Sequence, residues 1–373
     1  MRHPIIHVHI ADIHFGSIDP ETEFKILVEQ FINPIAQIPF NILAIDGDLF
    51  DRKYSANSLS VSYAIQFVNM CVSMCLEKNA ALIMISGTKS HEADQLSLFK
   101  DLTRLYPNNV FVIESIQFLY LFGYKILCIP EEYGRDPWYY ESFLCQEYDM
   151  VFMHGTLVGG VYGANKEKLN SNREPVFSID SFSCCKGPII SGHVHKAMCL
   201  NGYMYYVSNP VRYKFGEEEE KGYGICISSD YGHRYIFMPI KSFRYDTIPF
   251  SALRTNDPNT IVKKLNELQA NGIDFIRLDM RGLSPNEQEL ASYVTGVLND
   301  RFAHDPRITL LKPAVNESQE VVNTTNEILS KYEGMDFLLD PKLSELERFI
   351  MYINHYKGDG FITVESLKNL LNS

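Results

Sequence analysis

The sequence predicts an α/β fold with two packed mixed β-sheets flanked by helices, followed by a small α/β cap domain and C-terminal helices. From residue 1 to about 245, short apolar runs alternate with amphipathic stretches, which is the pattern of an α/β domain. Helix-like stretches separate only the early runs, so part of the sheet structure must be antiparallel. A second helix-and-strand pattern begins around 243–250 and predicts the separate cap.

The apolar runs are the expected strands. They cover 4–10, 41–45, 81–86, 125–129, 150–153, 187–191, 203–208, 223–228 and 235–240. Amphipathic helices are expected where apolar residues recur every three or four positions, over 21–36, 58–78 and 93–105. Period-two alternation places His7 and His9 on one face of the first strand, and we expect a structural role for this pair.

Four parts are expected along the chain. The stretch 261–313 reads helix, strand, helix, strand, and a polar segment separates it from two amphipathic helices around a Gly-Asp-Gly turn. The turn is not a calcium-binding EF-hand loop, because His355 and Ser366 stand where carboxylates are required. The parts are a main domain (1–245), a cap (246–315), a linker (316–342) and C-terminal helices (343–373).

Composition limits the function and the compartment. The net charge of −12 argues against holding nucleic acid by bulk electrostatics, although bound divalent metals would add local positive charge. The acidic run 217–220 is expected to be a solvated loop. Eight cysteines without C-x-x-C pairs indicate neither a zinc ribbon nor a disulfide framework. Free thiols, with no expected signal peptide or membrane span, predict a cytoplasmic protein.

Five apolar runs each end in residues of metal-ligand type. Strand ends along one edge of a sheet converge in space, which is where α/β proteins place ligands. Imidazole and carboxylate together suit manganese, iron or zinc better than calcium. The sequence therefore predicts one metal centre. Its residues are Asp12 and His14 in "HIADIH", Asp48 and Asp51 in "LAIDGDLFD", His91 in "MISGTKSHE", His154 in "VFMHGT", and His193 and His195 in "PIISGHVH".

The order of these motifs resembles a known family. The patterns D-x-H, G-D-x-x-D, G-N-H-[DE], H-G and G-H-x-H occur in this order in the calcineurin-like metallophosphoesterases. With "YVSNPVRYKFGEEEEKGY" at 206–223, the chain resembles the nuclease subunit of the SbcCD type and bacteriophage recombination exonucleases. The resemblance covers about 1–245. It implies an α/β/β/α sandwich and two divalent ions, for which we expect Mn²⁺, with Mg²⁺ as the alternative.

The resemblance also assigns roles. Asp48 would bridge the two ions, and His91 would sit beside the scissile phosphate, stabilising its charge or protonating the leaving 3′ oxygen. Asp51 and Glu92 would orient the ligands and His91. The remaining ligands would be Asp12, His14 and His195 for one ion, and His154 and His193 for the other.

One stretch departs from the family pattern. The family has Gly-Asn-His, whereas this chain has two residues more between Gly87 and His91. Alignment from His91 puts Ser90 at the Asn position, and alignment from Gly87 puts Thr88 there. A neutral hydroxyl is a poorer metal ligand than an amide oxygen. The sequence therefore predicts an intact first site, a weaker second site and a preference for manganese at raised concentration.

The resemblance implies a DNA exonuclease and endonuclease that acts in repair or recombination, 3′→5′ on duplex ends. It further implies a homodimer and an SMC-like ATPase partner of the SbcC type, which the apolar residues of 343–373 would contact. Two alternatives stay open. The same metal centre serves small-molecule phosphodiesterases and protein phosphatases. A degenerate site would instead make the protein a non-catalytic scaffold.

Overall fold

The computed structural model describes part of the chain. The chain divides into two compact units, one of residues 1–279 with 296–310 and one of residues 280–295 with 311–373. Almost all described residues belong to the first unit. The predicted linker and the predicted C-terminal helices lie outside the described residues. The described residues are 2–159, 175–217, 219–253, 257–279, 293, 296–298 and 307–311.

The first sheet has six strands and is mixed. Strands β1 to β4 run parallel, β13 pairs antiparallel with β1, and β14 pairs antiparallel with β13. In spatial order the strands are β14 (Gly232–Ile240), β13 (Lys221–Ser229), β1 (Ile5–Ile10), β2 (Ile42–Asp46), β3 (Ala81–Ile85) and β4 (Val110–Ile113).

The second sheet also has six strands and is mixed. Its central strands β12, β10, β7 and β6 are parallel, and both edge strands are antiparallel to their neighbours. In spatial order they are β11 (Met198–Leu200), β12 (Met204–Tyr206), β10 (Ile189–Gly192), β7 (Met150–His154), β6 (Tyr124–Ile129) and β5 (Gln117–Leu121). A separate pair joins β8 (Thr156–Leu157) to β9 (Val176–Phe177).

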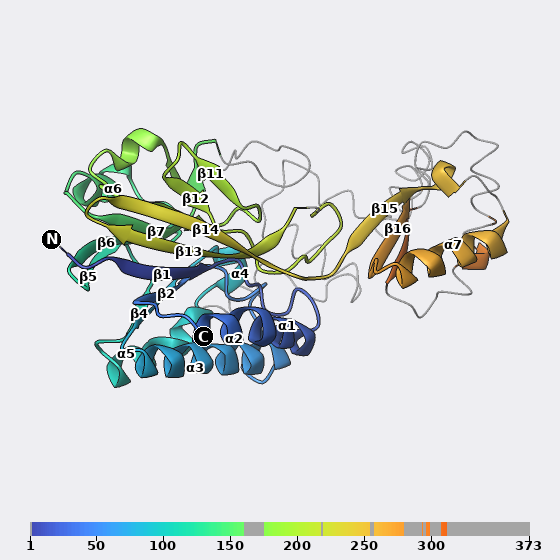
Figure 1. Ribbon diagram of the computed structural model, residues 1–373, viewed down its shortest axis with the longest axis horizontal. Helices are drawn as coiled ribbons and strands as arrows, with labels where there is room; N and C mark the ends of the chain where they lie inside the picture. The colour runs from blue at the N-terminus through green and yellow to red at the C-terminus, as the bar shows by residue number, and fades with distance from the viewer. Residues whose placement is uncertain are drawn as a thin grey trace, which may run out of the picture. The chain divides into compact units, whose positions relative to one another are not determined.

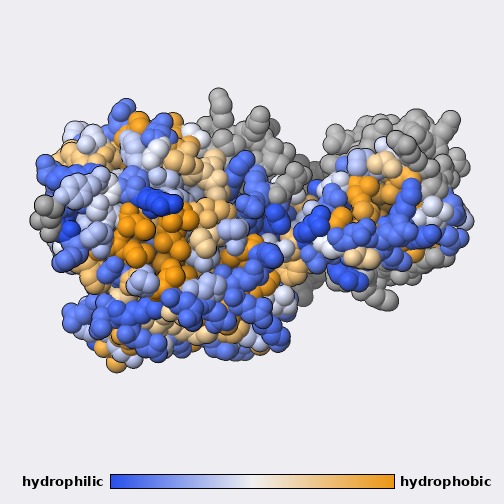
Figure 2. Space-filling model, in the orientation of Figure 1, coloured by the Kyte–Doolittle hydropathy of each residue, from blue (hydrophilic) through white to orange (hydrophobic). Residues whose placement is uncertain are grey.

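Helices cover the outer faces of the two sheets (Figure 1). The first sheet carries α1 (Pro20–Leu27), α2 (Asn33–Ala36), α3 (Leu59–Glu77) and α5 (Lys100–Leu105), and the second carries α6 (Pro137–Leu144). Short elements complete the domain: the π-helix η1 (Val28–Ile32), α4 (Lys89–Glu92), and the 3₁₀ turns η2 (Gln95–Phe99) and η3 (Ile179–Phe182). Figure 2 shows hydrophilic residues over this helix layer and hydrophobic residues over strands of the first sheet.

The central strands β2 and β3 are buried on both faces. On β2, Leu43 faces the helices and packs in one cluster with Phe67 of α3, whereas Ala44 faces the other sheet. Ala44 shares its cluster with Ile126 and Phe152 of the second sheet. Burial on both faces explains the continuous apolar runs of the sequence. The predicted fold class, two mixed sheets packed together and flanked by helices, is confirmed.

The expected helix over 21–36 is broken. A π-helical turn at Val28–Ile32 separates α1 from α2. Pro34, which lacks an amide hydrogen, follows this turn in the first turn of α2. Sequence reasoning also missed β4, β5, α6 and β11. The sequence of α6, "PWYYESFL", is rich in aromatic residues, which do not favour a helix strongly.

Helix α3 bears on the expectation that no segment is long and apolar enough to span a membrane. It is long and apolar enough, by length and composition alone, to cross a membrane, and half of that stretch is buried. Val68, Cys71 and Cys75 contribute to the core on the first sheet. The core helix of a soluble protein passes the same test.

The described residues of the predicted cap form a three-stranded sheet and one helix, and most of them belong to the first unit. Its strands, in order, are β15 (Tyr245–Pro249), β16 (Phe275–Asp279) and β17 (Ile308–Leu311). A 3₁₀ turn, η4 (Phe250–Leu253), precedes α7 (Pro258–Ala270), which buries Ile261 and Leu265. The strand β15 was not predicted. Most of the expected helix over 287–302 lies outside the described residues.

Candidate metal centre

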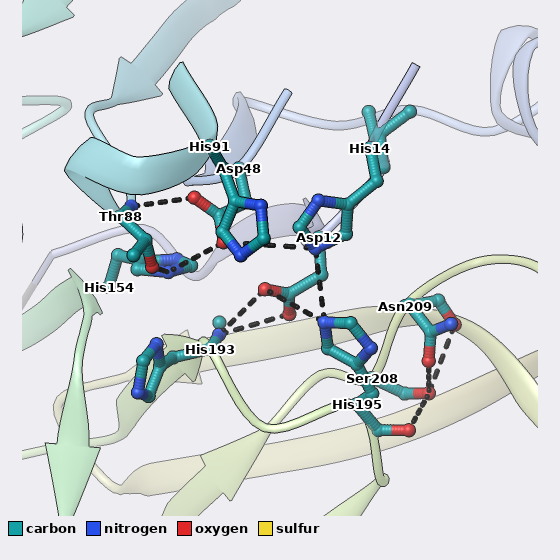
Figure 3. Close-up of polar contacts among 12 residues, drawn as sticks. Asp12, His14, Asp48, Thr88, His91, His154, His193, His195, Ser208 and Asn209 are labelled. Atoms are coloured by element: carbon teal, nitrogen blue, oxygen red, sulfur yellow. Dashed lines mark hydrogen bonds and ion pairs between the residues drawn. The ribbon is translucent and has the colours of Figure 1, made fainter. Parts of the chain in front are cut away.

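The predicted ligands come together in space, and they come from strand ends of both sheets (Figure 3). The first sheet contributes Asp12 and His14 after β1 and Asp48 after β2. The second sheet contributes His154 at the end of β7, and His193 and His195 just beyond β10.

The backbone is strained at four of these positions. Asp12, His14, Asp48 and His193 have φ angles of 51°, 54°, 50° and 88°, a region that non-glycine residues rarely adopt. Main-chain bonds hold two of them, because Asp12 N donates to Gly47 O at 3.1 Å and His14 N donates to Asp48 O at 2.9 Å. Strain of this kind persists only where the surroundings enforce it, and it concentrates at functional sites.

Two glycines allow the close approach of ligand-bearing segments. A Cβ atom on Gly87 would lie 2.1 Å from Asp48 Oδ1, so no side chain fits there. Gly47 has a φ of +89°, and a Cβ on it would lie 2.0 Å from His154 Nδ1. The glycines of the G-D and G-T-K-S-H-E motifs are therefore required by the packing around Asp48 and His154.

The first donor group contains Asp12, His14 and His195, whose donor atoms all lie within 4.8 Å of one another. The Nε2 atoms of His14 and His195 are 3.0 Å apart, and His195 Nε2 is 3.9 Å from Asp12 Oδ1. His195 Nδ1 faces Glu217 Oε1 at 3.4 Å, which leaves Nε2 directed at the group. Carboxylates commonly orient metal-binding histidines in this way.

The second donor group contains Glu131, His154 and His193. Glu131 Oε2 lies 3.2 Å from His193 Nδ1 and 3.5 Å from His154 Nε2. His154 Nδ1 lies 2.8 Å from Asp46 O and donates to it, so the ring presents Nε2 to the group. Glu131 was not among the predicted ligands.

Asp48 lies between the two groups. Its Oδ2 is 3.7 Å from His14 Nε2 and 3.4 Å from His154 Nε2. Its Oδ1 accepts a hydrogen bond of 2.6 Å from Thr88 N. The carboxylate therefore faces both donor groups.

The "GTKSHE" stretch resolves into a short helical turn. The two extra residues belong to α4, and Ser90 is exposed. Thr88 is buried, with Oγ1 3.1 Å from Glu131 Oε2 and 3.4 Å from His154 Nε2. Of the two alternatives for the family's Asn position, Thr88 is the residue that reaches the site.

His91 stands at the edge of the first donor group. Its Nδ1 donates to Asp51 O at 2.6 Å, and its ring centroid lies 4.7 Å from that of His14. The ring is partly exposed, and Asp51 holds it through a main-chain oxygen. The carboxylate of Asp51, which the sequence suggested as an orienting group, has an oxygen within 4.8 Å of ring nitrogens of His91 and His14, and it lies 3.6 Å from Arg52 Nε.

Glu92 orients a ligand-bearing loop. Its two oxygens accept hydrogen bonds from Leu49 N at 2.5 Å, next to Asp48 in the chain, and from Gly87 N at 2.8 Å, in the loop that packs against Asp48. Burial and the neighbouring Asp48 raise the pKa of Glu92 to about 7. Glu92 thus holds the backbone around Asp48, whereas the sequence suggested that it would also orient His91.

The buried carboxylates of the site favour the binding of a cation. Asp12, Asp48 and Glu131 are buried, and within the described residues no lysine or arginine forms an ion pair with any of them. Their charged partners are imidazoles, and a bound divalent ion would compensate the buried negative charge in place of the imidazole protons. Carboxylate and imidazole donors match a divalent transition metal such as manganese. The residues present therefore have the donor chemistry of a divalent metal site.

Metal affinity is expected to rise with pH. Burial alone would lower the pKa of His154, but Asp48, Asp12 and Glu131 outweigh burial and raise it well above its ordinary value. A histidine ligand must be neutral, so an ion has to displace this proton. Affinity should therefore increase by about tenfold per pH unit for each proton displaced, up to that raised pKa. Calorimetry of Mn²⁺ binding in buffers of different ionisation enthalpy measures the released protons. An affinity that does not change between about pH 6 and pH 8 would contradict this expectation.

His7 and His9 lie outside the centre and share one buried face, as the alternation predicted. Their rings bond to each other at 2.7 Å, with His9 bonded to Asp46 Oδ2 at 2.7 Å and His7 to Ser228 Oγ at 2.8 Å. These hydrogen bonds lie within the first sheet, and both rings also contact Phe152 of the second sheet, which fits the structural role that we expect.

Sequence reasoning missed two carboxylates of the site. Glu131 follows the run "KILCI", so it obeys the same strand-end rule that found the other ligands. Glu217 was expected in a solvated loop, but it is buried and accepts a hydrogen bond of 2.8 Å from Tyr213 N. Its pKa is lowered to about 2, because contacts with His195, Lys221 and Tyr213 N outweigh the opposing effect of burial.

The fold and the site define an α/β sandwich protein with a candidate metal centre. Comparison with protein families and with curated proteins gives no match. One solved structure aligns over 63% of this chain and 100% of its own, with 14% identity and a TM-score of 0.40. Another, a protein of unknown function from Aquifex aeolicus, aligns over 42% of this chain and 79% of its own, with 14% identity and a TM-score of 0.20. Neither likeness is close enough to carry an argument.

Proposed function

We propose that this chain is a phosphodiesterase of the metallophosphoesterase type that uses two divalent ions to hydrolyse DNA. One observation carries the proposal. Donors that the sequence arranges in the order D-x-H, G-D, H-G and G-H-x-H converge around the single carboxylate of Asp48. Two ions held by this donor set would act as Lewis acids on a phosphate and neutralise its charge during in-line displacement.

The remaining residues have distinct tasks in this proposal. His91 is held by Asp51 O through Nδ1, so Nε2 is the atom left to stabilise or protonate a leaving oxygen. Glu92 binds both the loop that carries Asp48 and the loop that begins at Gly87, and Glu217 orients His195. Each of these residues acts by holding a group or by moving a proton at a defined atom.

DNA is the proposed substrate because the motif set and the added cap resemble nucleases of the SbcCD type. The same resemblance supports 3′→5′ cleavage at duplex ends, a homodimer, an SMC-like ATPase partner of the SbcC type and a cytoplasmic role in repair or recombination. The net charge of −12 requires the ions, local basic residues or the partner to supply the attraction for DNA.

The net charge also favours a second candidate, a small-molecule phosphodiesterase, since a small substrate gains little from an extended basic surface. A non-catalytic scaffold is less well supported. The buried donors and the hydrogen bonds of His91, Glu92 and Glu217 retain what a catalytic centre needs.

The test is cleavage of end-labelled duplex DNA by the full-length protein with Mn²⁺, Mg²⁺ or EDTA. We expect degradation with Mn²⁺, less with Mg²⁺, and none with EDTA. A nitrophenyl phosphodiester is assayed in parallel. Cleavage of the diester without cleavage of DNA would favour the small-molecule candidate. Metal binding without cleavage of either substrate, with or without an ATPase partner, would favour the scaffold.

A further inference from the structure

We infer that Glu131 is a ligand of the second ion and takes the place of the amide oxygen that the family pattern provides there. The inference rests on the proposed two-ion centre and assigns a residue that neither the motifs nor the resemblance assigned. Its basis is the position of Glu131 Oε2, which lies 3.2 Å from His193 Nδ1 and 3.5 Å from His154 Nε2.

The surroundings of Glu131 fix the direction of its carboxylate. Glu131 follows β6, and its backbone N donates to Ser86 O, just past β3, at 3.3 Å. Oε1 accepts the hydroxyl proton of Tyr133, and Oε2 accepts that of Thr88 at 3.1 Å. The residue is only 3% exposed. The side chain is therefore held from two sides with Oε2 directed at the two imidazoles.

Thr88 has a different task from the one that alignment suggests. Its backbone N binds Asp48 Oδ1 at 2.6 Å, and its hydroxyl binds Glu131 Oε2. It thus positions one carboxylate of each sheet. A hydroxyl that donates its proton to a carboxylate in this way need not contact the ion itself.

The neighbouring Glu132 provides a contrast. It is also buried, but its Oε1 pairs with Arg135 Nη2 at 3.0 Å and its Oε2 accepts a hydrogen bond from Ile116 N at 3.0 Å. The two adjacent buried carboxylates therefore differ in the partners that stabilise their charge. Glu132 has a cation from the chain, whereas the carboxylate of Glu131 contacts two hydroxyls and two imidazoles.

The assignment reverses the expectation of a weak second site. That expectation assumed that a neutral hydroxyl replaces an amide oxygen. With Glu131, the second ion is offered carboxylates from Asp48 and Glu131 and imidazoles from His154 and His193. A carboxylate carries a negative charge that neither an amide nor a hydroxyl carries, so the second site should bind Mn²⁺ about as firmly as the first.

Calorimetry with MnCl₂ on the metal-free, full-length protein tests the inference. The wild type should bind two ions with similar affinity, and Glu131→Gln should bind the second ion more than about 100-fold more weakly. Electron paramagnetic resonance should show a coupled manganese pair in the wild type and an isolated ion in Glu131→Gln. Glu132→Gln is the matched control and should retain the pair. Circular dichroism establishes that each variant is folded.

The variant Thr88→Val separates the two candidate ligands. If Glu131 is the ligand, Thr88→Val retains the second ion with reduced affinity. Loss of the ion in Thr88→Val, with an unchanged pair in Glu131→Gln, would overturn the inference and leave the two-ion proposal standing. A wild type that binds both ions but cleaves neither DNA nor a diester would overturn the proposed function and leave the Glu131 assignment standing. A wild type that binds no manganese would overturn both.

Discussion

Replacing Asp48 with Asn is expected to abolish phosphodiester cleavage and to weaken the binding of both ions. The carboxylate lies 3.7 Å from His14 Nε2 and 3.4 Å from His154 Nε2, so its negative charge serves both donor groups. Asn keeps the shape and can still accept the hydrogen bond from Thr88 N, so the variant removes the charge with little change in packing. Loss of a shared ligand should exceed the 10–100-fold effect typical of groups that only orient ligands.

The effect is measured as bound manganese per chain and as the rate of DNA degradation. Asp94→Asn is a matched control, because Asp94 is an exposed carboxylate near the same loop and pairs with Lys53 at 3.2 Å. The control should behave as wild type. An Asp48→Asn protein that binds two ions and retains its cleavage rate would remove Asp48 from the centre.

Replacing His91 with Asn is expected to reduce the cleavage rate by about 10²–10⁴-fold while both ions stay bound. His91 Nδ1 donates to Asp51 O at 2.6 Å, and an Asn amide can supply a donor at the same point. The variant therefore preserves the loop contact and removes Nε2, the atom proposed to act on the leaving oxygen. His91→Ala removes both atoms and should lose at least as much activity.

Metal content decides between two roles for His91. His91, His14 and Asp51 also form a group with donor atoms within 4.8 Å of one another, so His91 has the geometry of a ligand as well. Retained manganese with lost cleavage supports the action of His91 on the reacting phosphate. If an ion disappears together with the activity, His91 is a ligand and its proposed role at the leaving oxygen is wrong.

The fold class was predictable because buried strands leave a strong signal. The run at 41–45 is apolar on both faces, since Leu43 faces the helices and Ala44 faces the second sheet. Edge elements leave a weaker signal. Strand β5 exposes Tyr120 and α6 has two adjacent tyrosines, so neither shows the apolar pattern of its kind of element. The π-turn at 28–32 depends on how α2 begins, which periodicity does not report.

The candidate site was predictable where a residue's place followed from a strand end. Asp12, Asp48 and His154 fall into this class, and all three converge. The role of Thr88 was not decidable, because alignment from either side of "GTKSHE" is equally good until the turn of α4 is known. Glu217 was missed because a run of glutamates looks solvated, whereas Glu217 itself is buried and faces His195 Nδ1 at 3.4 Å.

The contribution of both sheets to the centre has a consequence for how the domain holds together. Hydrogen bonds already join the sheets at this end, from His154 Nδ1 to Asp46 O and from Glu131 N to Ser86 O. Ions coordinated by residues of both sheets would act as cross-links between the sheets. The stabilisation that they provide would depend on the concentration of free metal. A ligand that binds only the native state adds about 2.7 kcal/mol at a concentration of 100 times its Kd. Without ions, three buried carboxylates at this end have only imidazoles as charged partners among the described residues, so chelation should loosen the sandwich first at the edge that carries the metal centre.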